Sequence, residues 1–319
     1  MPGVPTLNDV RRGLENPVLT FDHVRHQLRL RARRYHGAVH RRLSEESPTN
    51  VLDEDWENLI ILDGCRYDTF EACNSIDGDL QSRISLGSQS WEFLRRNFAG
   101  KSVHDTVYVT ANPFATRLGD DVFHAVVDLL DEWDDKLQTV PPEAVAAAAL
   151  DAHEEFPEKR LLVHFMQPHY PFIGERGRTL DVRGYSPTQD DGFDAPSVWQ
   201  ILRHDHYDDD GITRETVTEA YRENLSLALP HVEKIVSELP GRSVVTADHG
   251  NLLGERLYPI PVREYGHPRG LYSPALVRVP WLVVDDGQSR PITSDPPVDQ
   301  STPDADVVSR RLSALGYRA

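Results

Sequence analysis

Three side chains of types that commonly bind metals come directly after two short apolar runs of the sequence. Asp63 follows the run at 58–62, and Asp248 and His249 follow the run at 243–246. Each run predicts a buried strand, and open α/β sheets bind ligands at the carboxyl ends of their strands. A helix cap is the alternative for Asp63 alone. Two carboxylates and an imidazole together suit a divalent cation such as zinc or manganese, and this donor set does not separate the two.

A candidate nucleophile lies at the start of a predicted helix. Ser90 opens the helix 90–98 in SLGSQSWEF. On local sequence alone it is a helix cap, whose oxygen accepts a hydrogen bond from a free backbone N–H. The same helix end attracts anions, and a serine that has lost its proton to a bound metal can attack phosphorus or sulfur there. Ser85 and Ser88 are rival nucleophiles in the same segment.

Three histidines are candidate site residues, and their local sequences predict different environments. His164 and His169 lie in VHFMQPHYPF, at the end of the predicted strand 160–166. His164 falls within the strand and is interpreted as a core histidine, whereas His169 is expected to be exposed at the sheet edge. His267, in REYGHPRG, has no predicted strand before it and is by itself a surface loop residue.

The elements that must position these residues alternate from residue 58 onward. The predicted strands are 58–62, 106–110, 160–166, 243–246 and 281–284. The predicted helices are 90–98, 122–133, 142–156 and 214–239, the last kinked at Pro230. This alternation is typical of an α/β fold with a mostly parallel sheet covered by helices.

A chain of 319 residues accommodates one large α/β domain with appendages. We expect an arginine-rich helical extension at 1–50 and a catalytic domain at 51–286. Residues 176–213 carry eight aspartates and predict a lid loop or a solvated acidic insertion within that domain. Residues 287–319 predict a proline-containing linker and a short C-terminal helix.

The charge is strongly acidic, with 34 Lys and Arg against 51 Asp and Glu and a net charge of −17. Only four of the cations are lysine. The composition indicates a salt-adapted cytosolic protein, or else an ordinary acidic enzyme from an arginine-preferring genome. It argues against nucleic-acid binding, which needs a basic face for the phosphates.

The expected location is the cytoplasm. No stretch approaches the roughly 20 apolar residues of a membrane helix, and the N-terminus lacks the pattern of a secretory signal. Cys65 and Cys73 are the only cysteines, too few for a disulfide framework or a four-thiolate zinc site.

One basic segment interrupts the acidic trend. Residues 21–43 contain seven arginines and one aspartate, a net charge of +6 that leaves −23 for the rest of the chain. Apolar residues recur there every three or four positions, which predicts an amphipathic helix. Such a helix could lie on an anionic membrane surface, at the inner face, or hold a polyanionic partner. Packing on its own acidic domain is the preferred interpretation.

Three motifs in order resemble the alkaline phosphatase superfamily. LIILDGCRYDTF, VVTADHGNLLGE and YGHPRGLYSPALVRVPWLVV match its sulfatase and phosphoglycerol-transferase-like branch, particularly archaeal sulfatase-like proteins, and the acidic composition points to a haloarchaeal one. HFMQPHYPF fits the histidine–proline segment of that branch. The resemblance covers roughly residues 57–285 and implies an α/β/α sandwich around a mostly parallel sheet.

The resemblance also implies roles for individual residues. It makes Asp63, Asp248 and His249 metal ligands, and Ser90 the nucleophile and a further ligand.

Two histidines and one arginine complete the implied site. The resemblance implies that His169 and His267 either bind a second metal or bind phosphate or sulfate directly. Arg66 matches the arginine that usually follows the first metal aspartate, with a structural ion pair beside Asp63 or Asp68 as the alternative.

Three features of the sequence depart from the family pattern. Gly64 stands where sulfatases have a second aspartate, and Gln167 stands where a carboxylate for a second metal would be sought. Neither Cys65 nor Cys73 begins the Cys-x-Pro-x-Arg signature that is converted to formylglycine. Phosphate chemistry is therefore expected over sulfate chemistry.

These observations predict a metal-dependent hydrolase or transferase of phosphate mono- or diesters with a serine nucleophile. Zinc or manganese is the expected metal, ahead of magnesium or calcium, and the substrate is a small-molecule, glycan or lipid phosphate ester. The alternatives are a sulfuryl ester hydrolase that works without formylglycine and a non-catalytic family member that serves assembly.

Overall fold

The computed structural model describes most of the chain, with gaps near both ends and in the predicted insertion. The described residues are 28, 30–33, 35–36, 47–180, 198–203, 211–258, 262–285, 287–298 and 304–315.

Seven strands form the central sheet, in the order β2-β9-β6-β1-β5-β3-β4. Their bounds are β1 Asn58–Leu62, β2 Asp79–Ile84, β3 Val103–Thr110, β4 Phe123–Asp128, β5 Arg160–Phe165, β6 Ser243–Thr246 and β9 Arg278–Val284. Strand β9 is antiparallel to both of its neighbours, and the other four neighbouring pairs are parallel. The expectation of an α/β fold with a mostly parallel sheet is confirmed.

Strand β1 lies at the centre of this sheet because it is apolar on both faces. All five of its residues are buried, as are all four of β6. It pairs in parallel with β5 on one side and β6 on the other, so that Ile60 lies opposite both Val163 and Val245. A strand buried on both sides favours a continuous apolar run over alternation. The carboxyl ends of β5, β1 and β6 consequently emerge side by side.

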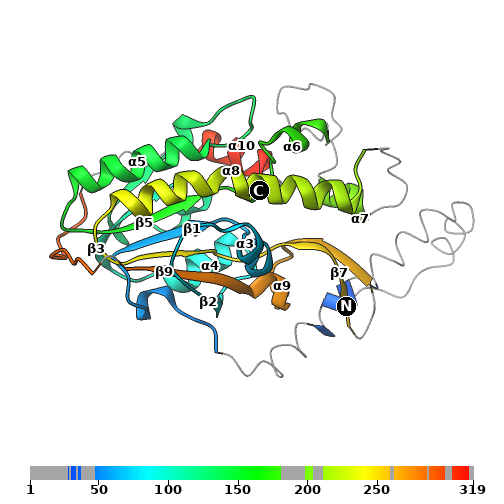
Figure 1. Ribbon diagram of the computed structural model, residues 1–319, viewed down its shortest axis with the longest axis horizontal. Coiled ribbons are helices and arrows are strands. Elements are labelled where there is room, and N and C mark those ends of the chain that lie inside the picture. Colours follow the sequence, from blue (N-terminus) through cyan, green and yellow to red (C-terminus); the bar gives the residue numbers. More distant parts are fainter. Residues whose placement is uncertain are drawn as a thin grey trace, which may run out of the picture.

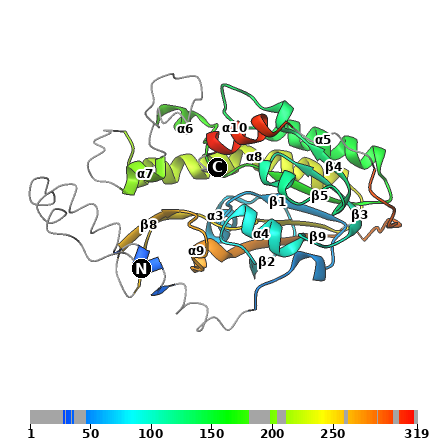
Figure 2. The ribbon, with the colours of Figure 1, turned by 180° about the vertical axis from the view of Figure 1, so that it is seen from behind.

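The described helices and 3-10 turns cover both faces of the sheet. Their bounds are α3 Tyr67–Cys73, α4 Ser90–Asn97, α5 Pro142–Glu155, α6 Glu175–Thr179, α7 Val198–Arg203, α8 Arg214–Glu238, α9 Pro274–Val277, α10 Ala305–Ala314, η1 Val51–Asp53, η2 Pro113–Arg117 and η3 Leu130–Glu132. Helices α5 and α8 run together along one side of the sheet (Figure 1), and their apolar faces pack with Ile60 and Leu62 of β1. Helix α4 packs on the opposite face against Leu59 and Ile61 (Figure 2). The layers therefore form the expected α/β/α sandwich.

Helix α8 is the longest described helix and runs without interruption through Pro230. Thr213 caps its first turn in a reciprocal capping box with Thr216. Its buried stripe, including Leu225, Val232 and Ile235, holds it on the sheet. Packing of that stripe outweighs the backbone hydrogen bond that a proline removes.

The prediction of a helix at 122–133 is wrong. Residues 123–128 form strand β4, and η3 follows it. Strand β4 pairs in parallel with β3, with Val126 opposite Tyr108 and Val127 opposite Val109. Valine side chains fit a pleated surface well, and β3 offers an open edge of backbone donors and acceptors. Pairing with a distant segment therefore outweighed the local helical spacing.

A two-stranded hairpin lies outside the main sheet and was not predicted. It consists of β7 Leu252–Leu257 and β8 Val262–Gly266 in antiparallel pairing. Helix α3, strand β2 and the first residues of β9 were also not predicted. The hairpin matters for the site because β7 begins just after His249 and β8 ends just before His267.

The described part of the basic N-terminal segment is helical and contacts this hairpin. Residues 28, 30–33, 35 and 36 are helical, and Ala32 is buried in an apolar cluster with Leu252 and Leu257. Nε of Arg33 lies 2.7 Å from Oε2 of the buried Glu264. These contacts agree with packing of the helix on its own domain. The remainder of 21–43 lies outside the described residues.

The other predicted appendages are described in part. Helices α6 and α7 fall within the predicted insertion 176–213, and most of its acidic cluster lies outside the described residues. Residues 287–298 lie along the amino edge of the main sheet, where Arg290 donates to Asn58 Oδ1 and the backbone oxygen of Lys159. Helix α10 confirms the predicted C-terminal helix. Among the described residues, no helix is both long enough and apolar enough to cross a bilayer.

Candidate functional site

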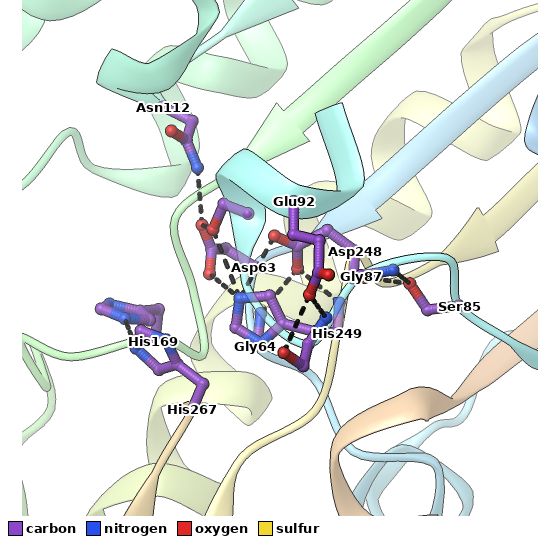
Figure 3. Close-up of polar contacts among 12 residues, drawn as sticks. Asp63, Gly64, Ser85, Gly87, Glu92, Asn112, His169, Asp248, His249 and His267 are labelled. Carbon is purple, nitrogen blue, oxygen red and sulfur yellow. Dashed lines mark hydrogen bonds and ion pairs between the residues drawn. The ribbon is translucent and has the colours of Figure 1, made fainter. Parts of the chain in front are cut away.

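Four chain segments bring polar side chains together at the carboxyl edge of the sheet (Figure 3). Asp63 follows β1, Asp248 follows β6, Asn112 follows β3 and His169 follows β5. Because β3, β5, β1 and β6 are consecutive in the sheet and parallel, their carboxyl ends share one edge. The sheet topology thus joins residues that are far apart in sequence.

Asp63, Asp248 and His249 form a compact group of possible metal ligands. Nε2 of His249 lies 3.6 Å from Oδ1 of Asp63 and 3.4 Å from Oδ2 of Asp248. All three side chains are fully buried. Within the described residues, neither of those two carboxylate oxygens has a hydrogen-bond partner. Buried carboxylate oxygens without partners carry a high desolvation cost, so this donor set fits a divalent cation.

Backbone contacts fix the ligands in place. Oδ1 of Asp248 accepts hydrogen bonds from the backbone N–H groups of Gly64 at 3.0 Å and His249 at 2.8 Å, so Oδ2 is the oxygen that could hold a cation. Nδ1 of His249 lies 2.7 Å from the backbone oxygen of Gly250 and must donate to it. The lone pair of Nε2 therefore faces the two carboxylates, as a metal-binding tautomer requires.

Gly64 explains one departure from the sulfatase pattern. Its φ angle is +68°, in the left-handed region that favours glycine. This backbone turn aims its N–H group at Asp248. A second aspartate at position 64 would be strained in this conformation.

Ser90 lies within hydrogen-bond distance of two of the three predicted ligands. Its Oγ is 3.1 Å from Oδ2 of Asp63 and 3.3 Å from Nε2 of His249. The interpretation of Ser90 as a helix cap is not confirmed, because Gln89 occupies the cap position of α4 and makes no side-chain cap hydrogen bond. Ser90 is the first helical residue, and its side chain turns toward the strand ends.

The rival serines have other partners. Ser85 Oγ donates to the backbone oxygen of Asp248 and accepts from Gly87 N–H. Ser88 Oγ donates to Oε2 of Glu92 at 3.0 Å and accepts from Gly270 N–H at 2.8 Å. The two hydroxyls therefore bind loop backbone and the first turn of α4, and among the described residues neither hydrogen-bonds to Asp63 or His249.

Asn112 is a site residue that the sequence reasoning missed. Its Nδ2 donates to Oδ2 of Asp63 at 2.7 Å, and its Oδ1 accepts from Phe114 N–H at 2.9 Å as the cap of η2. Oδ2 of Asp63 thus faces two donors while Oδ1 remains for a cation. A polar residue two positions beyond a predicted strand was the available signal.

The electrostatics of Asp63 favour a bound cation. Burial raises the pKa of Asp63 well above its ordinary value, and the neighbouring Asp248 carboxylate raises it further. Hydrogen bonds from Ser90 and Asn112 lower the pKa in part. A divalent cation between the two carboxylates would stabilise the ionised form of both.

His169 and His267 meet beside this group, and two expectations about them are corrected. Their Nε2 atoms lie 2.9 Å apart, and the His267 ring centroid is 4.9 Å from those of both His169 and His249. His169 is only 5% exposed, and its ring packs against His267 rather than facing solvent at the sheet edge. His267 directly follows β8 and is half-buried, so it is no surface loop residue.

Burial controls the charge of these histidines. It lowers the pKa of His169 to about 4, with a smaller contribution from His249. It also lowers the pKa of His267, helped by His169 and His249. Both rings are neutral at pH 7, so each offers one acceptor and one donor nitrogen. The Nδ1 atom of His169 faces the backbone oxygen of Tyr170 and donates to it, which leaves its Nε2 as an acceptor.

Arg66 and Gln167 lie near the site, but their side chains hydrogen-bond to residues other than the candidate ligands. The Arg66 guanidinium donates to Asp68, to Glu255 and to the backbone oxygen of Asn251. This geometry agrees with the structural ion pair that was the alternative for Arg66. Nε2 of Gln167 donates to the backbone oxygen of Val140. In the described part of the chain, Asp63, Asp248 and His249 are the one cluster of at least three metal-ligating side chains.

Comparisons with known proteins give structural similarities only. No protein-family model and no curated protein matches the sequence. Among solved structures, the integral membrane lipooligosaccharide phosphoethanolamine transferase A (EptA) of Neisseria meningitidis has a TM-score of 0.45 at 13% identity. The match covers 70% of this chain and 47% of that one, so the chain spans about half the length of EptA.

For two further similar structures, the match spans a larger share of the other protein's chain. The C-terminal periplasmic domain of the phosphoethanolamine transferase EptC from Campylobacter jejuni has a TM-score of 0.46 at 12% identity, covering 72% of this chain and 78% of that one. A putative sulfatase from Bacteroides thetaiotaomicron has a TM-score of 0.42 at 14% identity, covering 82% and 71%.

Proposed function

We propose that this protein is a metal-dependent hydrolase or transferase of phosphate mono- or diesters, in the sulfatase-like branch of the alkaline phosphatase superfamily. One observation carries the proposal. The Ser90 hydroxyl contacts Asp63 and His249 at the point where an imidazole nitrogen meets two buried carboxylate oxygens that have no hydrogen-bond partner in the described part of the chain. A nucleophile, a metal site and a helix N-terminus thus coincide.

The proposed metal ligands are Asp63, Asp248, His249 and Ser90. Zinc or manganese suits this mixed nitrogen and oxygen set best, and magnesium or calcium comes second. When bound, the cation supplies positive charge that lowers the pKa of the serine hydroxyl and offsets negative charge on the phosphate oxygens.

Ser90 performs the substitution in this proposal. Asp63 Oδ2 accepts the hydroxyl proton of Ser90 as a hydrogen bond and orients the Oγ lone pairs. Oγ then forms a bond to phosphorus as its proton passes to Asp63 Oδ2, while the ester P–O bond breaks in line with it and the leaving oxygen takes a proton from His267. The N-terminal end of α4, where the helix dipole is positive, faces the developing charge on the phosphate. Water or an acceptor alcohol later takes the phosphoryl group, and Ser90 regains its proton.

His169 and His267 are placed to handle the leaving oxygen. Their facing Nε2 atoms are 2.9 Å apart, and His169 Nε2 is the acceptor of this pair because its Nδ1 donates to Tyr170. His267 therefore holds a proton that it can share with a substrate oxygen, and either ring can bind the transferred group. A role as ligands of a second metal stays open for the same two nitrogens.

The substrate is proposed only as a class. Small-molecule, glycan or lipid phosphate esters are consistent with the serine site. The net charge of −17 argues against nucleic acid.

The experiment compares matched esters. An aryl phosphate, a diaryl phosphodiester and the corresponding aryl sulfate are assayed with the metal-free protein after separate additions of Zn²⁺, Mn²⁺, Mg²⁺ and Ca²⁺. We expect turnover of one of the phosphate esters to exceed that of the sulfate by a wide margin. Faster sulfate cleavage would support a sulfuryl ester hydrolase instead. Absence of both metal binding and turnover would support a non-catalytic role in assembly.

A further inference from the structure

His164 lies beside both carboxylates of the proposed metal site but on a different oxygen of Asp63 from His249. Its Nε2 is 3.8 Å from Oδ2 of Asp63 and 3.9 Å from Oδ2 of Asp248. His249 Nε2 lies nearest to the other oxygen of Asp63, Oδ1. His164 therefore approaches Asp63 from the side of its hydrogen bonds with Ser90 and Asn112.

The sheet holds His164 in this place. It is the fifth residue of β5, opposite Ile61 of β1 and Thr110 of β3. Its side chain is fully buried. A polar ring at the centre of a sheet costs free energy unless its nitrogens are satisfied, so both of its nitrogens need an account.

Tyr108 accounts for one nitrogen. Its hydroxyl oxygen lies 2.8 Å from Nδ1 of His164, and both side chains are fully buried. The other nitrogen, Nε2, has no hydrogen-bond partner among the described residues and lies 3.8 and 3.9 Å from carboxylate oxygens of Asp63 and Asp248. A lone pair on Nε2 would be repelled by those oxygens, whereas an N–H is attracted to them. The proton therefore belongs on Nε2, and Tyr108 donates to Nδ1.

We propose that His164, oriented by Tyr108, is a positioning residue that directs its Nε2–H between Asp63 and Asp248 and holds both carboxylates ready for the metal. The inference rests on the metal site of the proposed function. An N–H dipole between two carboxylates reduces their mutual repulsion and restricts their rotation. Polar groups that orient metal ligands in this way typically contribute about 10- to 100-fold to metal affinity.

Metal affinity of full-length variants tests the proposal. Zn²⁺ and Mn²⁺ binding are measured by competition with a chelator for wild type, His164→Gln and Tyr108→Phe. We expect affinity to fall about 10- to 100-fold in His164→Gln and less in Tyr108→Phe. The double variant should bind no more weakly than His164→Gln, because Tyr108 acts through His164. His124→Gln is the matched control, since His124 is a buried histidine of β4 that contacts the backbone oxygen of Asp295, and its metal affinity should equal that of wild type.

A spectroscopic measurement separates positioning from direct ligation. In ¹⁵N-histidine-labelled wild type loaded with ¹¹³Cd²⁺, His249 should show nitrogen–cadmium coupling and His164 should not. The ¹⁵N shifts of His164 should report a protonated Nε2 and an unprotonated Nδ1. Should His164→Gln fail to fold, this measurement and Tyr108→Phe decide the matter.

The outcomes separate this inference from the proposed function. Cadmium coupling to His164, or wild-type affinity in His164→Gln, would overturn the positioning role and leave the metal site intact. A wild-type protein that binds none of the three metals would overturn both.

Discussion

Oγ of Ser90 lies 3.1 Å from Oδ2 of Asp63, which connects the first turn of α4 to the end of β1. The same hydroxyl is 3.3 Å from Nε2 of His249. One serine therefore contacts candidate ligands that follow two strands, while Ser85 bonds to the Asp248 backbone and Ser88 to Glu92 of α4. This contact distinguishes the three serines and leads to the first prediction.

Ser90→Ala should remove nearly all turnover of a phosphate ester, because the variant loses the attacking oxygen. We expect a decrease on the order of a thousandfold or more in kcat at saturating metal. Ser85→Ala and Ser88→Ala should retain most of the activity. An active Ser90→Ala together with an inactive Ser88→Ala would assign the nucleophile to Ser88 and leave only Asp63, Asp248 and His249 as proposed ligands.

Asp248→Asn should lower metal content and activity together while the fold persists. The amide keeps the acceptor for Gly64 and His249 but offers the cation no negative charge. Metal content is measured by elemental analysis after dialysis. Asp128→Asn is a matched control, because Asp128 also ends a strand at this edge, and there it bonds to Leu130 N–H. Full metal content in Asp248→Asn would remove Asp248 from the set of ligands.

Asp63→Asn should raise the thermal stability of the metal-free protein. Burial and Asp248 raise the pKa of Asp63 in the folded state. Above the ordinary carboxyl pKa, this group ionises more readily in the unfolded chain than in the folded protein, so the free energy of unfolding falls as pH rises. An amide is neutral at every pH and avoids this cost. We expect the Tm without metal to rise by a few degrees and added metal to stabilise wild type but not the variant. A lower Tm in the variant would show that the carboxylate is stabilising without metal.

His164 and His169 should each destabilise the metal-free protein as the pH falls from about 6.5 to about 4, a trend that protonation of the buried Asp63 opposes. Burial lowers the pKa of both His164 and His169 to about 4, whereas an unfolded histidine titrates near 6.5. In this window the unfolded chain binds more protons than the folded protein, so each ring lowers the free energy of unfolding by up to about 3 kcal/mol at pH 4. Urea unfolding at several pH values measures the slope. His169→Gln should reduce it by one proton, and an unchanged slope would show that His169 is protonated in the folded state.

Arg33→Ala should destabilise the protein more than Arg31→Ala. Burial would raise the pKa of Glu264, but hydrogen bonding and charge from Arg33, together with Arg203, keep it below its ordinary value. Removing Arg33 leaves a buried carboxylate with one cation fewer. Arg31 is exposed on the same helical segment. We expect the Tm to fall by a few degrees for Arg33→Ala alone, and equal Tm values would contradict a packing role for this segment.

A flotation assay addresses the membrane alternative for residues 21–43. If the segment packs on its own domain, the full chain and a variant lacking residues 1–46 should float equally poorly with anionic liposomes at fixed low salt. Flotation of the full chain alone would support contact with an anionic membrane surface. Salt must be held constant because screening weakens such contacts.

The sequence alone determined the parts of the site that depend on local pattern. Asp63, Asp248 and His249 directly follow apolar runs, and such runs form buried strands wherever they occur in an α/β fold. The carboxyl ends of parallel strands meet at one edge, so the ligand group could be expected without coordinates.

The tertiary structure decided what depends on pairing between distant segments. Residues 123–128 became a strand because β3 offered an edge for hydrogen bonding, which no local spacing reveals. His267 reached His169 because the β7–β8 hairpin returns the chain to the sheet edge. The choice of Ser90 over Ser88, and the contact of Asn112 with Asp63, likewise required the packing of α4 and β3 on the sheet. These contacts depend on hydrogen bonds and burial between residues that are far apart in the chain. The local order of residue types therefore does not predict them.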